Sequence, residues 1–178
     1  MNKTKNYKYL DYATPKEQHI LQYLYGYSTK FIVCKDKKGN TVEQTKTYDG
    51  NIICSYPDIE VYTNETQTVM IALIEVKGFL QFPRRDLPFD TDLNILAIKE
   101  NQLKSYIKVQ KEEQTNINII FVVGYSPDEY AFYWESLDNI LAMECVKKTE
   151  WAFFQKKIVR FYDASLFRRD IEYCVIPF

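Results

Sequence analysis

Asp58, Glu75 and Lys77 combine residue types and spacing that suit metal binding and the activation of water. Pro57-Asp58 precedes an apolar run, and that run ends at Glu75-Val76-Lys77. Because side chains alternate along a strand, Glu75 and Lys77 should point to one face while Val76 is buried on the other. Asp58 can reach the first face from a neighbouring strand.

Two carboxylates at the end of a strand form a hard-oxygen site suited to Mg²⁺ or Mn²⁺, and the backbone carbonyl of Val76 offers a further ligand. A lysine beside such an ion would bind, orient or help deprotonate the attacking water, while the ion stabilises charge on a phosphate. The pattern indicates metal-dependent phosphodiester hydrolysis, with Glu75, Asp58 and Val76 as metal ligands.

The alternative interpretation is a surface ion pair between Glu75 and Lys77, which would contribute little to stability. Two other places in the chain serve as controls. Asp36-Lys37-Lys38 also fits D-x-K but occupies a polar turn, and Pro127-Asp128 has no acidic-x-lysine triplet after it. Only Asp58, Glu75 and Lys77 combine a Pro-Asp pair with an apolar strand that ends in an acidic-x-lysine triplet. We therefore favour the catalytic interpretation.

The elements around these residues predict the fold. Val69 to Val76 is nearly all apolar, as in a central strand covered on both faces. The proline-containing segment from Phe79 to Asp92 predicts a long loop. A helix should follow, capped by Thr91 or Asp92 and ending near Glu113.

The rest of the chain adds helices and strands on both sides of this region. The further elements expected are a helix from Thr14 to about Gly26, a hairpin beginning with Thr29–Lys35, short strands at Ile52–Tyr56 and Ile59–Tyr62, strands at Ile117–Val123 and Tyr130–Trp134, and a short helix at Leu137–Val146. The segment Trp151–Tyr162 fits either a helix or a strand, and we favour a strand. This order predicts an α/β fold with a mixed central sheet flanked by helices. A length of 178 residues suits a single domain over residues 1–178.

The composition of the chain limits the classes of function that it can have. A formal net charge of −1 provides no global positive field, so a nucleic-acid site must be local. The chain has a single His, which argues against a His-based zinc site and against a Ser-His-Asp catalytic triad. Its four cysteines are widely spaced, as expected of reduced thiols that form no disulfide framework. The N-terminus has no targeting signal, and the longest apolar run, Val69 to Ile74, is too short to cross a bilayer. We therefore expect a cytoplasmic protein without membrane contact.

PDIEVY followed by IALIEVKGF resembles motifs two and three of the PD-(D/E)XK nuclease superfamily. Gln102 to Tyr106 is similar to the Q-x-x-x-Y signature of its RecB-type branch and lies on the helix after the catalytic strand, as it does there. At i and i+4 the two side chains share one helix stripe. The resemblance implies a restriction-endonuclease-like core in which Gln102 and Tyr106 join Asp58, Glu75 and Lys77. A structural role for Tyr106 at the core edge is the alternative.

Two residues of the first helix have competing interpretations. Glu17 matches the position of an acidic residue that many superfamily members use as an extra metal ligand, but it also lies three residues after Thr14, as in a capping box. His19 lies on the same helix, and some cap-snatching viral endonucleases use a helix His as a manganese ligand. For a lone His we favour a structural role.

The function expected is cleavage of nucleic acid, with DNA favoured over RNA, by an enzyme whose small size is typical of a phage or mobile element. The clusters Arg84-Arg85, Lys104/Lys108/Lys111 and Arg168-Arg169 could supply phosphate contacts, or could be ordinary solvated charges. The alternatives are an RNA endonuclease and a catalytically inactive nuclease-fold protein that binds nucleic acid or protein. The oligomeric state is open, a homodimer included.

Overall fold

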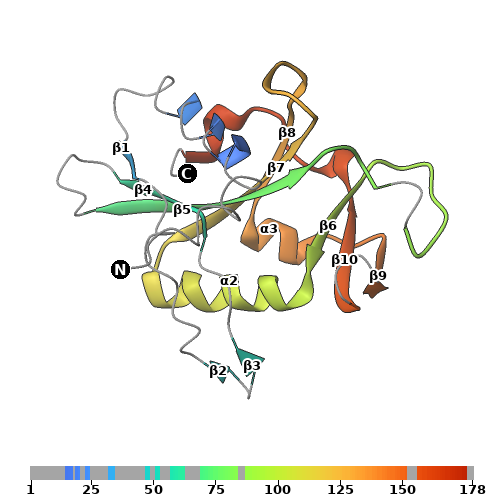
Figure 1. Ribbon diagram of the computed structural model, residues 1–178. Coiled ribbons are helices and arrows are strands. Elements are labelled where there is room, and N and C mark those ends of the chain that lie inside the picture. Colours follow the sequence, from blue (N-terminus) through green and yellow to red (C-terminus); the bar gives the residue numbers. More distant parts are fainter. Residues whose placement is uncertain are drawn as a thin grey trace, which may run out of the picture.

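A five-stranded mixed sheet forms the centre of the computed structural model, which describes residues 15–17, 19, 20, 23, 24, 32–34, 47, 48, 51, 52, 57–62, 69–83, 87–151 and 156–175. Its strands, in spatial order, are β1 (Ile32–Cys34), β4 (Ile59–Tyr62), β5 (Met70–Phe79), β7 (Asn116–Val123) and β8 (Ala131–Ser136) (Figure 1). β5 and β7 are parallel and the other neighbours antiparallel. The predicted mixed sheet is confirmed.

β5 is the central strand, as its apolar sequence predicts. Leu73 is fully buried on one face of the sheet, and Ile74 and Val76 are buried on the other. Burial on both faces explains why the sequence does not alternate between polar and apolar residues. The strand continues to Phe79, beyond the predicted end at Val76.

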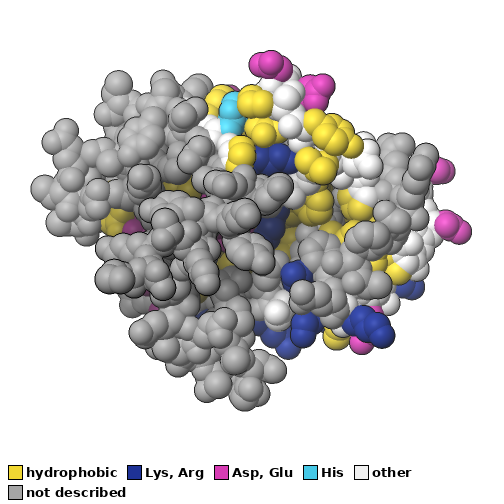
Figure 2. All heavy atoms as spheres, viewed as in Figure 1, with side chains coloured by type: hydrophobic (Ala, Val, Ile, Leu, Met, Phe, Trp, Pro, Cys, Tyr) yellow, Lys and Arg dark blue, Asp and Glu magenta, His cyan; other side chains and the backbone are white. Residues whose placement is uncertain are grey.

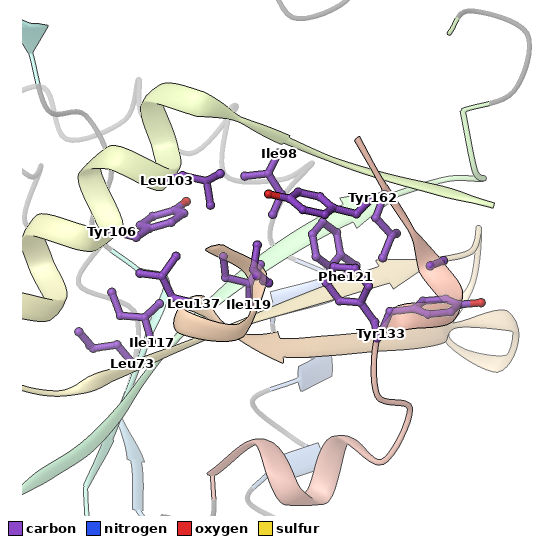
Figure 3. Close-up of a cluster of buried hydrophobic side chains, with 14 of the residues drawn as sticks. Leu73, Ile98, Leu103, Tyr106, Ile117, Ile119, Phe121, Tyr133, Leu137 and Tyr162 are labelled. Carbon is purple, nitrogen blue, oxygen red and sulfur yellow. The ribbon is translucent and has the colours of Figure 1, made fainter. Parts of the chain in front are cut away.

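Helices cover both faces of this sheet. Helix α2 (Glu100–Glu113) and the short α3 (Leu137–Ala142) lie on the face that contains Leu73, and apolar side chains fill the space between (Figure 3). The helical residues 15–17, 19, 20, 23 and 24 lie on the opposite face (Figure 1), where Ile20 and Leu24 pack with Ile74 and Val76. The prediction of flanking helices is therefore confirmed.

A second, three-stranded antiparallel sheet lies beside the first. Its order is β6 (Ile95–Lys99), β10 (Lys157–Asp163) and β9 (Lys147–Trp151). The prediction that a helix begins at Thr91 or Asp92 is wrong, because β6 occupies this region and α2 begins only at Glu100. Ile95, Leu96, Ala97 and Ile98 are all buried, and pairing with β10 over the whole strand outweighs their partial helical periodicity.

The remaining elements are short. They are the strand pair β2 (Thr47–Tyr48) and β3 (Asn51–Ile52) and the 3₁₀ turns η2 (Pro127–Glu129), η4 (Ala164–Leu166) and η5 (Ile171–Val175). The predicted hairpin turn at 36–40 and helix ends at Thr14 and Gly26 lie outside the described residues. The segment predicted as one strand, Trp151–Tyr162, spans the end of β9 and most of β10. Among the described helices, none is long and apolar enough to cross a membrane.

Candidate active site

Asp58 and Glu75 lie across from each other at the point where β4 and β5 separate. The β4–β5 ladder pairs Ile59 with Ile74, so one further step of the register places Asp58 opposite Glu75. Side chains so placed have Cβ atoms about 5 Å apart on one face of the sheet. The Val76 N–H donates a 2.9 Å hydrogen bond to Asp58 Oδ2, so this carboxylate replaces a backbone acceptor at the end of the ladder.

Lys77 lies beside Glu75 on the face covered by α2. Its ammonium group donates a hydrogen bond to Glu75 Oε1 and another, of 3.0 Å, to the hydroxyl oxygen of Tyr106. The ammonium group also lies 5.6 Å from the centroid of the Tyr106 ring. The structure thus brings together Asp58, Glu75, Lys77 and Tyr106, from three different elements.

The Glu75 carboxylate lies in an environment that disfavours its charge. Glu75 is only 6% exposed. Burial raises the pKa of this carboxyl; the positive charge of Lys77 opposes the rise, while the neighbouring Asp58 carboxylate adds to it. A second cation close to both carboxylates would stabilise the ionised form of Glu75.

Tyr106 is completely buried, and its ring packs with Leu103 in the cluster between α2 and the sheet (Figure 3). The catalytic and structural interpretations of Tyr106 are therefore compatible, because its ring packs in the core while its hydroxyl contacts Lys77. Gln102 lies one helical turn before Tyr106 and is half-buried. The functional roles of both residues remain predictions.

The first helix contributes a buried carboxylate and an aromatic contact. Glu17 is 7% exposed and is followed on its helix by Ile20 and Leu24 at the i+3 and i+7 positions that pack on the sheet. Thr14, the proposed capping partner, lies outside the described residues. The His19 ring stacks on Phe132 at 5.8 Å and meets Tyr130 edge-on at 5.2 Å.

Lys16 holds this helix at the ends of β5 and β7, a contact that the sequence analysis missed. Its ammonium group donates hydrogen bonds to the backbone carbonyls of Phe79 and, at 3.3 Å, Val122. A Cβ atom on Gly78 would lie 2.9 Å from Lys16 Cδ, so Gly78 leaves space for the lysine stem. Burial lowers the pKa of Lys16. A single lysine near a helix start carries no sequence signal for such a contact.

Three of the basic residues suggested as phosphate contacts, Arg168, Arg169 and Lys108, contact other side chains in the structure. Arg168 forms an ion pair with Glu135 at 3.2 Å, and Arg169 lies over the Tyr133 ring at 4.1 Å. Lys108 pairs with Glu112 at 3.5 Å. Lys104 and Lys111 are exposed on α2, whereas Arg84 and Arg85 lie outside the described residues.

The donor chemistry at the separation of β4 and β5 fits a divalent metal. Asp58 and Glu75 would hold such an ion, since carboxylate oxygens are the ligands that Mg²⁺ and Mn²⁺ prefer. Within the described part of the chain, no three His, Cys, Asp or Glu side chains form a group suited to a metal. Among the described residues, the backbone carbonyl of Val76 is a candidate third donor.

Comparison with known proteins identifies the fold. No protein-family model and no curated protein matches the chain. Among solved structures, the Holliday junction resolvase Hjc of Archaeoglobus fulgidus superposes with a TM-score of 0.51 at 13% identity, covering 93% of this chain and 98% of the resolvase. The chain has a restriction-endonuclease-like fold.

Hjc belongs to the PD-(D/E)XK nuclease superfamily, whose motifs the sequence around Asp58 and Glu75 resembles. Assignment to the RecB-type branch rests on Gln102 and Tyr106 alone and stays a prediction.

Proposed function

We propose that this protein is a metal-dependent nuclease that hydrolyses phosphodiester bonds in DNA. The observation that carries the proposal is the convergence of Asp58 and Glu75 with Lys77 and the Tyr106 hydroxyl at one end of the β4–β5 pair. A surface ion pair between Glu75 and Lys77 would not require a second carboxylate and a buried tyrosine hydroxyl at the same point. The near burial of Glu75 also argues against that simpler interpretation.

Each residue has a distinct role in this proposal. Asp58 and Glu75 would hold Mg²⁺ or Mn²⁺, with the Val76 carbonyl and Glu17 as further candidate ligands. A bound ion of this kind supplies a more acidic water and stabilises negative charge on the scissile phosphate. Lys77 would bind that phosphate and orient the attacking water, while Tyr106 holds the lysine in position and Gln102 contacts the substrate from the same helix.

The fold of the neighbour supports DNA as the substrate. Hjc is a Holliday junction resolvase, so a protein of the same fold acts on branched DNA. Structural likeness at this identity establishes the fold alone, and a function requires residues that perform it. Here those residues are Asp58, Glu75 and Lys77.

The test is incubation of the purified protein with labelled single-stranded DNA, double-stranded DNA, a four-way DNA junction and RNA, each with Mn²⁺ and with EDTA. Mn²⁺-dependent cleavage of DNA by the wild type, and its loss in Lys77→Ala, is expected. Cleavage of RNA alone would assign the protein as an RNA endonuclease. Binding of DNA without cleavage under all conditions would instead identify an inactive nuclease-fold protein.

A further inference from the structure

Lys99 and Lys157 lie on one face of the second sheet. Lys99 ends β6 and pairs with Val159 of β10, and Lys157 precedes Val159 by two residues. Because paired residues and residues two apart share a face, both lysines project from the side that also carries Val159 and Phe161. Lys99 is half-buried and Lys157 is exposed.

β5 meets this same face of the second sheet. Phe79 packs against the cluster that contains Ala97, Val159 and Phe161. Lys77 precedes Phe79 by two residues and so lies on the same side of β5. Three strands, β5, β6 and β10, therefore each bring one lysine to the same region, where the charges of Lys77 and Lys157 both act on Lys99.

The electrostatics agree with this placement. Burial lowers the pKa of Lys99, and the nearby positive charges of Lys77 and Lys157 lower it further. Like charges held together on rigid strands repel one another and are stabilised by an anion bound between them. Lys and Arg side chains also gather on the described surface around β6, β9 and β10 (Figure 2).

The position of Lys99 is fixed by its neighbour in sequence. Glu100, the first residue of α2, accepts hydrogen bonds from Arg160 of β10 and, at 3.1 Å, from Lys148 of β9. These hydrogen bonds lower the pKa of Glu100 and keep the carboxylate ionised. The junction between β6 and α2 is thereby bound to both other strands of its sheet, so Lys99 lies on a rigid support.

We propose that Lys99 and Lys157 bind a second phosphate of the nucleic-acid strand, adjacent to the phosphate held at Lys77. This proposal rests on the proposed nuclease function and adds the path of the strand, which runs from the end of β5 along β6 and β10. Phosphate contacts of this kind position a strand without reading its sequence. They make binding depend on salt, because each contact releases counterions from the nucleic acid.

The experiment measures DNA affinity in EDTA, so that cleavage cannot interfere, by fluorescence anisotropy of a labelled oligonucleotide over a series of NaCl concentrations. Lys99→Gln and Lys157→Gln should each weaken binding and reduce the slope of log K against log salt by about 0.7–0.9, the effect of one lost phosphate contact. Lys99→Arg keeps the charge and should retain the wild-type slope. Lys147→Gln, an exposed substitution of the same charge at the far end of β9, is the matched control.

The outcomes separate the two proposals. Suppose that the wild type binds DNA and that the salt slopes of Lys99→Gln and Lys157→Gln equal the slope of Lys147→Gln. This result would overturn the second phosphate site and leave the nuclease function standing. Absence of DNA binding by the wild type would overturn the second phosphate site, and cleavage with Mn²⁺ would then decide the nuclease function separately. Reduced slopes confined to the two variants, with the wild-type slope in Lys99→Arg, would support the second site.

Discussion

Lys77 and Tyr106 are joined by a 3.0 Å hydrogen bond between the ammonium group and the phenolic oxygen, although 29 residues separate them. The Tyr106 ring is fully buried between α2 and the sheet, so packing determines where its hydroxyl lies. Lys77, by contrast, lies on β5 beyond the end of its pairing with β4. The position of the lysine therefore depends on the helix as well as on its own strand.

Tyr106→Phe should lower kcat for DNA cleavage about tenfold, since a lost hydrogen bond to a charged group costs on the order of 1.5 kcal/mol. The ring remains in place, so the fold and the Mn²⁺ affinity should be unchanged. Single-turnover cleavage and a Mn²⁺ titration measure the two effects. Tyr133→Phe, in the same cluster, is the control and should cleave normally. Equal activity of both variants would mean that Tyr106 serves packing alone.

Asp58 has two separable functions, and two substitutions distinguish them. Asp58→Asn keeps an oxygen that can accept the Val76 N–H but removes the charge, so metal affinity should fall at least tenfold while stability stays within about 1 kcal/mol. Asp58→Ala should lose the metal and also about 1 kcal/mol of stability. Calorimetry with Mn²⁺ and urea unfolding measure these effects. Undiminished Mn²⁺ binding by Asp58→Asn would remove Asp58 from the ligand set.

Glu75 should make the metal-free protein less stable as the pH rises. Its pKa in the folded state is raised above the usual value of 4.5, so the folded chain holds this proton to a higher pH than the unfolded chain does. Between the two pKa values unfolding releases a proton, and the free energy of unfolding falls with increasing pH. In EDTA, Glu75→Gln should exceed the wild type in Tm at pH 8, and the difference should shrink towards pH 4.

Thermal unfolding across this pH range, with the exposed Glu113→Gln as control, provides the measurement. A wild-type Tm at pH 8 equal to that of Glu75→Gln would show that Lys77 fully compensates the buried charge. Adding Mn²⁺ should stabilise the wild type and leave Glu75→Gln unaffected, since a ligand that binds only the folded state raises its stability.

Lys77→Ala should reduce cleavage by two orders of magnitude or more, about the effect of removing one group that stabilises developing charge. Glu75 loses its nearest positive charge in this variant, which favours the protonated carboxyl at low pH. Metal binding should therefore weaken more steeply in this variant than in the wild type as the pH falls, as measured by calorimetry. Normal cleavage at pH 8 would contradict the assignment of Lys77.

Glu17→Gln distinguishes a metal ligand from a helix cap. Gln can close a capping box as Glu does, so stability should not fall, whereas a ligand role predicts weaker Mn²⁺ binding because the site loses one negative charge. We expect the weaker binding, since Glu17 is buried on the helix that Lys16 holds against the end of β5. A Mn²⁺ titration identical to that of the wild type would assign Glu17 to the cap.

The sequence was most informative where one local pattern determines the structure. The apolar run before Glu75 predicted the central strand, and side-chain alternation predicted that Glu75 and Lys77 share a face. The i, i+4 spacing of Gln102 and Tyr106 placed both on one stripe of α2, and the structure adds the contact to Lys77. Their chemical roles remain for experiment.

The sequence was least informative where pairing between distant segments decides the outcome. Ile95 to Lys99 reads as the start of a helix, and only the partner strand β10, about 60 residues away, makes it a strand. The proximity of Lys99 to Lys77 follows from that pairing, so it could not be predicted either. Likewise, the position of Lys16 depends on the carbonyls of Phe79 and Val122, at the ends of two remote strands.

The parallel pairing of β5 with β7 has a consequence for synthesis of the protein on the ribosome. Asp58, Glu75, Lys77, Gln102 and Tyr106 all precede β7, which begins at Asn116. The ribosome thus completes every candidate catalytic side chain before the strand that covers one edge of β5. Closing a long crossover is entropically unfavourable and slow compared with forming local contacts. A nascent chain that ends at Glu113, the last residue of α2, therefore carries the whole set of reactive groups without the sheet that aligns them, so activity should arise only after the translation of β7.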